Sequence, residues 1–555
     1  MARKTKKSKE PFKFKPAVNF GAAAAELDTL LGSCFISTAY YDQISDISNP
    51  KCGIVGRAGT GKTAILEQLK REKDHYVVLN PEELAFQFLG GSELIRALRK
   101  SGVNLDYFYK LLWRHVFVVE ILKHFFPEES RRYGKVSQLM ERIKGTIRPD
   151  RDRDRALQYL DDWGATILQV PQERIRQIHD TFEKRLQADL GVTGPWATVF
   201  GLEASAKGEM TWKRDIDERV TIAKKVVNGI QVQELNAVKK YLGTVILDDP
   251  EKPCYVLIDD LDRFLGEDPL VYEIIRALLV EIYDWSDVAR VKIVFALRDN
   301  ILHRIEAGFQ SRAYQREKLA DQRIGLRWTH QELIDLSDRR LSEIAKNMGA
   351  SDSPRLTDIL PKQNSRRPAG VAYILERTLD RPRDVIDFLN KASALAVGKN
   401  KISWQYLLQA EGPYSNSRFE ALLDEWRENY PDLELVTKLL VSRPPRFPIG
   451  DWTEEDILEI MTDTSMSQAG WIDDLTKEYN RDKSHDHGLA LRKFRQQVLS
   501  ILYEVGLVGV RTGAGASDRY SYNSQPVLAP NEIAEDTSVI VHPTFHQALS
   551  IGQSN

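Results

Sequence analysis

The chain has 555 residues, of which 42% are hydrophobic and 28% are charged, and its net charge at pH 7 is -2. This composition excludes a largely disordered chain, and the length exceeds what one hydrophobic core serves, so we expect several domains. The near balance of acidic and basic residues excludes a surface covered with nucleic-acid-binding charge, so any basic surface must be local.

The chain begins with a basic segment. Residues 1–16 contain Arg3, Lys4, Lys6, Lys7, Lys9, Lys13 and Lys15. We predict a flexible tail, because short charged termini rarely fold alone; a nucleic-acid-binding arm is the alternative. No apolar run typical of a secretion signal follows, and the three cysteines (Cys34, Cys52 and Cys254) have neither disulfide nor metal-ligand spacing. We therefore expect a cytoplasmic protein.

A glycine-rich motif follows a short apolar strand at 53–55. The segment from Gly56 to Thr63, GRAGTGKT, fits the pattern G-x-x-x-x-G-K-[ST], and a helical pattern follows it. In such a P-loop, glycines let backbone N–H groups approach phosphate oxygens, the lysine bridges the β and γ phosphates, and the hydroxyl holds magnesium. The predicted phosphate-binding residues are Gly56, Gly59, Thr60, Gly61, Lys62 and Thr63. The predicted cofactors are ATP and Mg²⁺, with Thr63 as a magnesium ligand.

The segment between this motif and the next one is long and polar. Its most apolar stretch, Leu111 to Phe126, is short and carries several charged residues, so we predict a buried helix rather than a membrane span. We expect a mainly helical insert and no membrane partner.

A second motif supplies the carboxylates that a magnesium site requires. The apolar run that ends at Ile258 is followed by Asp259, Asp260 and Asp262, as in a Walker B strand. We assign Asp259 to the magnesium ion and Asp260 to the attacking water, which it orients or deprotonates. The role of Asp262 stays open, because acids after a strand also cap turns.

A third apolar strand, Val291 to Leu297, ends at Arg298. An arginine at this position can sense the γ phosphate through its forked donors, and a surface salt bridge is the alternative. A later helical pattern begins with Arg381-Pro382-Arg383. Proline suits the first turn of any helix, so an ordinary helix start is one interpretation of this segment.

These motifs together resemble the KAP and STAND branch of the P-loop ATPases, relatives of the AAA+ and origin-recognition ATPases. In that branch a second aspartate replaces the glutamate base of AAA+ proteins, and an arginine often ends the sensor strand, which matches Asp260 and Arg298. The resemblance implies a helical lid that presents Arg381, Pro382 or Arg383 to the nucleotide. Membrane-inserted KAP proteins carry transmembrane helices between the Walker motifs, whereas this chain has the polar insert.

The C-terminal part reads as helices followed by two short strands, Val508 to Arg511 and Arg519 to Asn523, which is typical of a winged helix. The cations placed for DNA contact are Arg492, Lys493, Arg495, Arg511 and Arg519. Nearby acids dilute them, and winged helices also dock proteins, so both partners stay open.

The predicted fold class is an α/β P-loop NTPase core with a parallel sheet flanked by helices, to which an insert, a lid and a C-terminal winged-helix domain are added. The expected units are a basic flexible tail (1–16), the ATPase core (17–80 and 251–346), a mainly helical insert (81–250), a helical lid (347–441) and the winged-helix domain (446–555).

We predict a slow ATPase that acts as a molecular switch and changes conformation or assembly with nucleotide state. The resemblance implies a role in bacterial anti-phage defence or stress regulation. The alternatives are a DNA-binding, origin-recognition-like ATPase with a mainly structural nucleotide, and a nucleotide-dependent scaffold. Because the sequence contains no nuclease, deaminase or protease signature, the expected partners are further copies of the chain or a separate effector protein.

Overall fold

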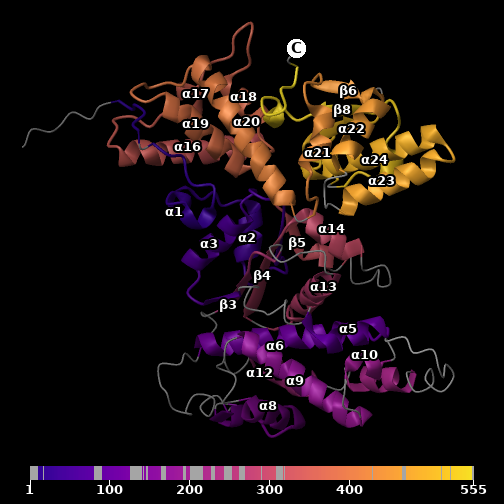
Figure 1. The fold of residues 1–555 in the computed structure, drawn as a ribbon. Coiled ribbons are helices and arrows are strands. Elements are labelled where there is room, and N and C mark those ends of the chain that lie inside the picture. Colours follow the sequence, from indigo (N-terminus) through magenta and orange to yellow (C-terminus); the bar gives the residue numbers. More distant parts are fainter. Residues whose placement is uncertain are drawn as a thin grey trace, which may run out of the picture.

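Short apolar runs form a five-stranded sheet at the centre of the chain (Figure 1). The structure is a computed structural model. It describes the chain except residues 1–10, 17, 80–90, 126–139, 142, 146–147, 164–170, 192–194, 201–216, 227–231, 243–252, 262–268, 289, 308–316, 318, 428, 465–469, 514, 526 and 553–555. The strands are β1 (Gly53–Val55), β2 (Tyr76–Leu79), β3 (Cys254–Ile258), β4 (Val291–Leu297) and β5 (Arg323–Gly325). Their order is β2-β3-β4-β1-β5 and every pair is parallel.

Helices cover both faces of this sheet, as predicted for a P-loop NTPase core. Tyr255 and Leu257 of β3 face one hydrophobic cluster together with helix α3 (Lys62–Glu72), whereas Val256 and Ile258 face the other with helix α13 (Pro269–Asp284). The alternation follows from the period of two in a β-strand, and burial on both faces explains the continuous apolar runs. The described parts confirm an α/β core with a parallel sheet.

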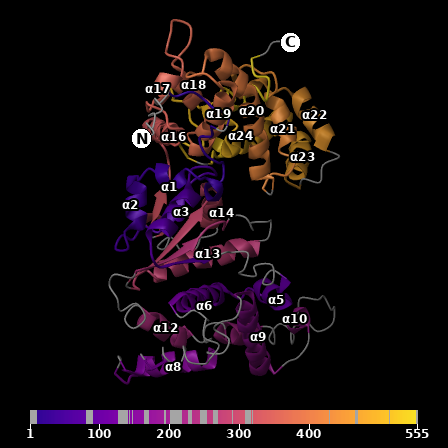
Figure 2. The ribbon, with the colours of Figure 1, turned by 90° about the vertical axis from the view of Figure 1, so that its left-hand side faces the viewer.

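The described part of the insert is helical and lies at the far end of the core from the lid (Figures 1 and 2). Its helices are α5 (Glu93–Lys100), α6 (Asp106–Phe125), α8 (Arg151–Trp163), α9 (Pro171–Leu190), α10 (Trp196–Val199) and α12 (Val232–Tyr241). Helix α6 packs against α13, β2 and β3, so insert and sheet share one hydrophobic cluster. Within the described residues, no helix combines the length and apolar character needed to cross a bilayer.

A second helical unit lies above the carboxyl ends of the strands (Figure 1). It contains α16 (His330–Asn347), α17 (Leu356–Ile359), α18 (Gly370–Glu376), α19 (Pro382–Leu395) and α20 (Trp404–Trp426). The predicted boundary between core and lid at 346/347 is wrong, because Leu333, Leu341 and Ile344 of α16 share a cluster with α18 and α19.

The predicted flexible tail also needs correction at its end. Phe12 and Phe14 are buried in the cluster of this helical unit, and the backbone N–H of Phe14 donates to the Lys399 carbonyl at 2.8 Å. Two aromatic rings bury enough apolar surface to fix a short segment, even between lysines. Residues 11–16 are therefore anchored, and residues 1–10 lie outside the described part.

The C-terminal unit has a three-stranded antiparallel sheet, in the order β6-β8-β7. Its main elements are α21 (Glu434–Thr437), β6 (Arg446–Pro448), α22 (Glu454–Thr464), α23 (Gly470–Lys483), α24 (His487–Val505), β7 (Val508–Arg511) and β8 (Ser538–Val541). Short 3-10 turns lie at 438–440, 449–451, 530–532 and 543–545. Strand β7 agrees with the prediction. The strand predicted at 519–523 is wrong, because Arg519 forms only an isolated bridge with Val510 and β7 pairs along its length with β8.

The predicted lid also ends too late. Leu422 and Trp426 of α20, with Leu433 and Val436, belong to the hydrophobic cluster of the C-terminal unit. Helix α20 therefore starts in one unit and ends in the next, so that it links the two.

Three shorter helices and a 3-10 turn at 25–27 complete the α/β core. The helices are α1 (Leu31–Cys34), α2 (Ala39–Ser45) and α14 (Asp299–Ala307).

Candidate functional site

The P-loop runs from the end of β1 to the first residue of α3, Lys62. Gly59 and Gly61 have φ angles of 78° and 97°, in the left-handed region where only glycine is unstrained. A Cβ atom added at Gly59 would also come within 3.1 Å of the Arg383 side chain. Glycine at this position therefore allows both the loop conformation and the close approach of helix α19.

Donors from several elements hold the loop carbonyls. The Arg381 guanidinium donates to the Ala58 oxygen at 2.9 Å, and the Trp328 indole N–H donates to the Thr60 oxygen at 2.7 Å. In a trans peptide the C=O and N–H groups point in opposite directions, so these anchors turn the N–H groups of Gly59 and Gly61 the other way. Both glycines line a cavity, which is the orientation that a phosphate cradle requires.

Lys62 and Thr63 lie at the start of α3, where the positive end of the helix dipole favours an anion. The Lys62 ammonium donates to the oxygens of Gly56 and Arg57, at 2.9 and 3.0 Å. The Thr63 hydroxyl acts to lower the pKa of the Asp259 carboxyl, so the two predicted magnesium ligands lie close to one another.

The two acids that follow β3 have different surroundings. Burial raises the pKa of Asp259, while the Thr63 hydroxyl, the Asp260 N–H at 2.9 Å and the charge of Lys62 act to lower it. Asp260 adopts a φ of 54°, which aspartate tolerates better than most residues and which is often found at functional sites. Asp262 lies outside the described residues.

Sheet order explains why these groups meet. Strand β4 lies between β3 and β1, and the carboxyl ends of parallel strands share one edge. The acids after β3, Arg298 after β4 and the P-loop after β1 are therefore neighbours. Arg298 also donates to the backbone oxygen of Glu425 in α20 at 3.3 Å.

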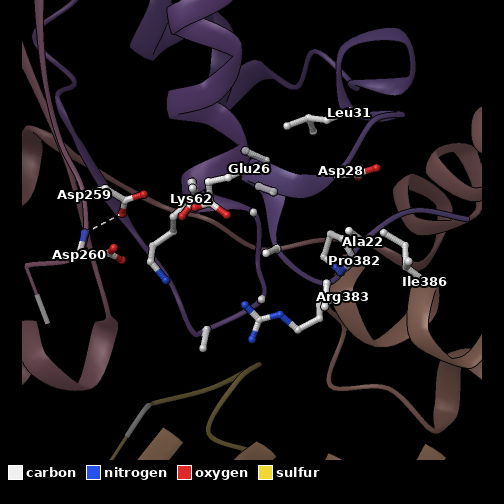
Figure 3. A pocket seen from close by; sticks show the side chains of 18 of the residues that line it. Ala22, Glu26, Asp28, Leu31, Lys62, Asp259, Asp260, Pro382, Arg383 and Ile386 are labelled. Carbon is white, nitrogen blue, oxygen red and sulfur yellow. Dashed lines mark hydrogen bonds between the residues drawn. The ribbon is translucent and has the colours of Figure 1, made fainter. Parts of the chain in front are cut away.

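These side chains surround a cavity of about 390 Å³. Its lining includes Ala58, Gly59, Gly61, Lys62, Thr63, Asp259, Asp260, Arg298, Pro382 and Arg383, together with Ala22 to Ala25, Leu31 and Ile386. Figure 3 shows Lys62 and the two aspartates on one side and Arg383 reaching toward them from α19. The segment 22–31 contributes the apolar side chains named above and also two acids, Glu26 and Asp28.

The three predicted lid residues have different roles in this geometry. Pro382 is the first residue of α19 and lines the cavity. Arg383 also lines it, and its buried Nε atom has no hydrogen-bond partner among the described residues. Arg381 does not line the cavity, because it bonds the Ala58 oxygen and the buried carboxylate of Asp384, at 2.9 and 2.8 Å.

Two loop residues also stand back from the cavity. The Thr60 hydroxyl donates to the Arg57 oxygen at 2.8 Å, and a Cβ atom at Gly56 would come within 2.8 Å of that hydroxyl. Gly56 and Thr60 are absent from the lining. They therefore shape the loop, whereas Arg381 supports it from the start of α19.

Sequence reasoning missed Arg57. This residue occupies a variable position of the P-loop motif, yet its side chain is buried against the C-terminal unit. Its guanidinium donates to the Ser521 hydroxyl and the Val505 oxygen, both at 2.7 Å. No signal in the sequence indicates this contact, because the motif places no requirement on that position.

The cations predicted for DNA contact are paired within the C-terminal unit. Arg492 and Arg495 contact Glu535 at 3.3 and 3.0 Å. The remaining contacts are Lys493 with Asp482 (2.6 Å), Arg511 with Asp518 (2.6 Å) and Arg519 with Glu532 (3.4 Å). These acids offset the positive charge that would attract a phosphate backbone.

Comparison with known proteins gives one family match. Residues 331–423 match the model of the FunZ-associated C-terminal helical domain, which covers most of α16 and all of α17 to α19 and most of α20. Most of the residues in the hydrophobic cluster of the helical unit lie within this match, and the cluster also contains Phe12, Phe14 and Phe20 from the start of the chain.

Two curated proteins are similar in sequence. One, from Escherichia coli (strain K12), is described as an 80.3 kDa protein of transposon gamma-delta; it is 23% identical over 544 residues, which are 96% of this chain and 67% of that protein. The other is the allergen Alt a 2 of Alternaria alternata, 27% identical over 154 residues, which are 27% of this chain and 79% of the allergen.

One solved structure, a Walker-type ATPase of Pyrococcus abyssi, has 11% sequence identity and a TM-score of 0.36, and the match covers 93% of this chain and 96% of that one. Similarity at this level assigns no activity to this chain.

Proposed function

We propose that this chain is an ATP-binding and ATP-hydrolysing molecular switch. One observation carries the proposal: the P-loop residues Lys62 and Thr63, the acids Asp259 and Asp260, and two arginines line the same cavity. This is the set of groups that phosphoryl transfer requires, namely a phosphate cradle, magnesium ligands, a carboxylate near the water and fixed positive charge.

The donor set fits a magnesium–triphosphate ligand. Thr63 and Asp259 line the same cavity and offer two oxygens, which suits a hard cation that also binds phosphate oxygens. A magnesium ion there would neutralise charge on the β and γ phosphates. Lys62 would exchange its bonds to the loop carbonyls for the phosphates.

Hydrolysis needs a group that orients or deprotonates water. Asp260 lines the cavity and follows the magnesium ligand directly, so it is the proposed base. Arg298 and Arg383 line the cavity too, and their charge would stabilise the γ phosphate in the transition state.

The switch follows from which elements touch the loop. Arg381 and Trp328 bond its carbonyls, and Arg57 joins it to the C-terminal unit. A ligand that moves the P-loop therefore acts on the helical lid and the C-terminal unit at once. We propose that the output is assembly of further copies or engagement of an effector protein; a role in anti-phage defence or stress regulation rests on the KAP and STAND resemblance alone.

The topology of the C-terminal unit, in which three helices precede paired antiparallel strands, supports a winged-helix-like domain. We propose that it docks protein, because its cations are paired internally. Stimulation of ATP turnover by double-stranded DNA would instead favour the origin-recognition-like alternative.

The experiment is turnover of ATP by the full chain and by Asp260→Asn. We expect this variant to bind magnesium–ATP as the parent does and to hydrolyse it on the order of 100-fold more slowly, since it loses a base and keeps the metal ligand. If Asp260→Asn hydrolysed ATP normally and Asp262→Asn did not, the assignment of the base to Asp260 would be wrong. Absence of turnover in the parent would contradict the hydrolytic function.

A further inference from the structure

A carboxylate near the end of α20 lies among the arginines around the P-loop. The Glu425 side chain is 14% exposed, and its Oε2 atom is 3.8 Å from a guanidinium nitrogen of Arg381. Arg298 donates to the backbone oxygen of the same residue. Glu425 belongs to α20, the helix that links the helical unit to the C-terminal unit. Its contacts with Arg381 and Arg298 therefore couple α20 to the candidate phosphate site.

Four guanidinium groups act on this carboxylate. Burial alone would raise the pKa of Glu425, but the charges of Arg381, Arg298, Arg57 and Arg383 outweigh burial and hold the pKa below its ordinary value. Glu425 is therefore ionised. These arginines come from the P-loop, the end of β4 and the start of α19. The negative charge of Glu425 therefore offsets positive charge from three separate elements.

Two of the four arginines are shared with the cavity. Arg298 and Arg383 line the cavity, whereas Glu425 does not. The Nε atom of Arg383 is buried and makes no hydrogen bond to a described residue. At least this donor of Arg383 is therefore not engaged by Glu425. An anion in the cavity would therefore meet guanidinium groups whose charge Glu425 already offsets in part.

We propose that Glu425 is a positioning residue that competes with the terminal phosphate of a nucleoside triphosphate for Arg298 and Arg383. The inference rests on the proposed nucleotide site and adds a determinant of its specificity. A triphosphate brings one more anionic group toward these arginines than a diphosphate does, so Glu425 opposes it more. The same repulsion loosens the end of α20 when the terminal phosphate is bound.

The test compares two neighbouring substitutions that remove the same charge. Glu425→Gln removes the competitor and keeps the shape of the side chain. Asp424→Asn is the matched control, because Asp424 is exposed and pairs with Arg427 outside the cluster. Affinities for a non-hydrolysable ATP analogue and for ADP are measured by calorimetry with magnesium, on full-length protein whose thermal unfolding has been checked.

We expect the ratio of ATP-analogue affinity to ADP affinity to rise about tenfold in Glu425→Gln, in the range of ordinary couplings between sites, and to stay at the parent value in Asp424→Asn. Glu425→Asp, which keeps the charge, should stay near the parent. An unchanged ratio in Glu425→Gln would overturn the inference while leaving nucleotide binding intact.

A second measurement needs no substitution. Hydrogen exchange of 419–426 in the parent should rise with the ATP analogue and stay unchanged with ADP, because only the terminal phosphate competes with Glu425. Equal exchange with both nucleotides would overturn the inference even if Glu425→Gln failed to fold. A parent that binds neither nucleotide would overturn this inference and the proposed function together.

Discussion

Arg381 and Arg383 flank one proline, yet they face different surroundings. The sequence placed both near the nucleotide, because either arginine at a helix start can bind phosphate. The structure separates them: the first is paired with the buried Asp384 and a loop carbonyl, and the second lines the cavity. Arg381 is the extended residue that precedes α19 and Arg383 lies in the first turn of that helix, so their side chains leave the backbone in different directions. The sequence alone gave no basis for a choice between them.

The two arginines should therefore respond differently to substitution. We expect Arg383→Ala to weaken ATP relative to ADP by about 1–3 kcal/mol without loss of stability. Arg381→Ala should destabilise the fold by about 3–5 kcal/mol, because it leaves the buried Asp384 carboxylate with weaker compensation. Nucleotide calorimetry and denaturant unfolding of both variants check this, and an equal loss of stability in both would contradict the separation.

His542 gives the C-terminal unit a defined response to acid. Burial, together with nearby His546 and arginines, lowers its pKa from 6.5 to about 3, and its Nδ1 atom accepts a hydrogen bond from the Thr544 N–H at 3.2 Å. Between about pH 6.5 and pH 3, His542 therefore binds a proton in the unfolded chain but stays neutral in the folded chain. Stability is fully present above about pH 6.5 and is lost as pH falls toward 3.

We expect the free energy of unfolding to fall by up to about 1.4 kcal/mol per pH unit between pH 6 and pH 4 from this group. The control is His542→Asn, whose amide oxygen can accept the same hydrogen bond and does not titrate. Unfolding curves at several pH values check the difference. Parallel pH profiles for parent and variant would show that His542 is not the group involved.

At the scale of elements, the local pattern of apolar residues predicted most strands of the parallel sheet. It failed in the C-terminal unit, where a strand pairs with a segment that is distant in sequence. The runs of β1, β3 and β4 are apolar apart from Lys292 because both faces of the sheet are covered there, and this is visible in sequence. The edge strand β2 is apolar as well, although its Val78 is exposed. The strand expected at 519–523 also shows strand-like residues. Its neighbour β7 instead pairs with β8, which lies further along the chain, and local alternation cannot reveal such a choice.

Domain boundaries failed for a related reason. Thr329 and Glu332 form a capping box at the start of α16, which marks where the helix begins but says nothing about which core the helix joins. Packing against α18 and α19 decides that. The insert was predicted as a separate unit, whereas its helix α6 shares a hydrophobic cluster with the sheet.

A buried ion pair fixes α6 to α13. Arg114 contacts Glu281 at 2.6 Å, and the Glu281 side chain is fully buried. We expect Arg114→Ala to cost about 3–5 kcal/mol of stability, because it leaves a buried carboxylate unpaired. Arg99→Ala breaks a partly exposed ion pair between α5 and Glu273 of α13, and it should cost less than about 1 kcal/mol of stability. Denaturant midpoints compare the two, and similar losses would contradict a special role for the buried pair.

At the scale of the whole molecule, the P-loop is the point where three units meet. Its motif could be predicted from sequence because phosphate chemistry restricts the residues that fit. Its contacts with Ser521 and Trp328 could not, because they depend on how distant units dock. The cavity lies between the core and the helical unit that contains α19, so residues of both units would act on the same ligand.

The central claim is that this cavity binds magnesium–ATP through Lys62. Calorimetric titration of full-length parent, Lys62→Ala and Lys70→Ala tests it most directly. Lys70 lies on the same helix and pairs with Glu67, so its substitution removes an equal charge away from the cavity. We predict that the parent and Lys70→Ala bind alike and that Lys62→Ala loses on the order of 100-fold in affinity, as expected for lost charge-assisted bonds to phosphate. Unchanged binding by a folded Lys62→Ala protein would contradict the account.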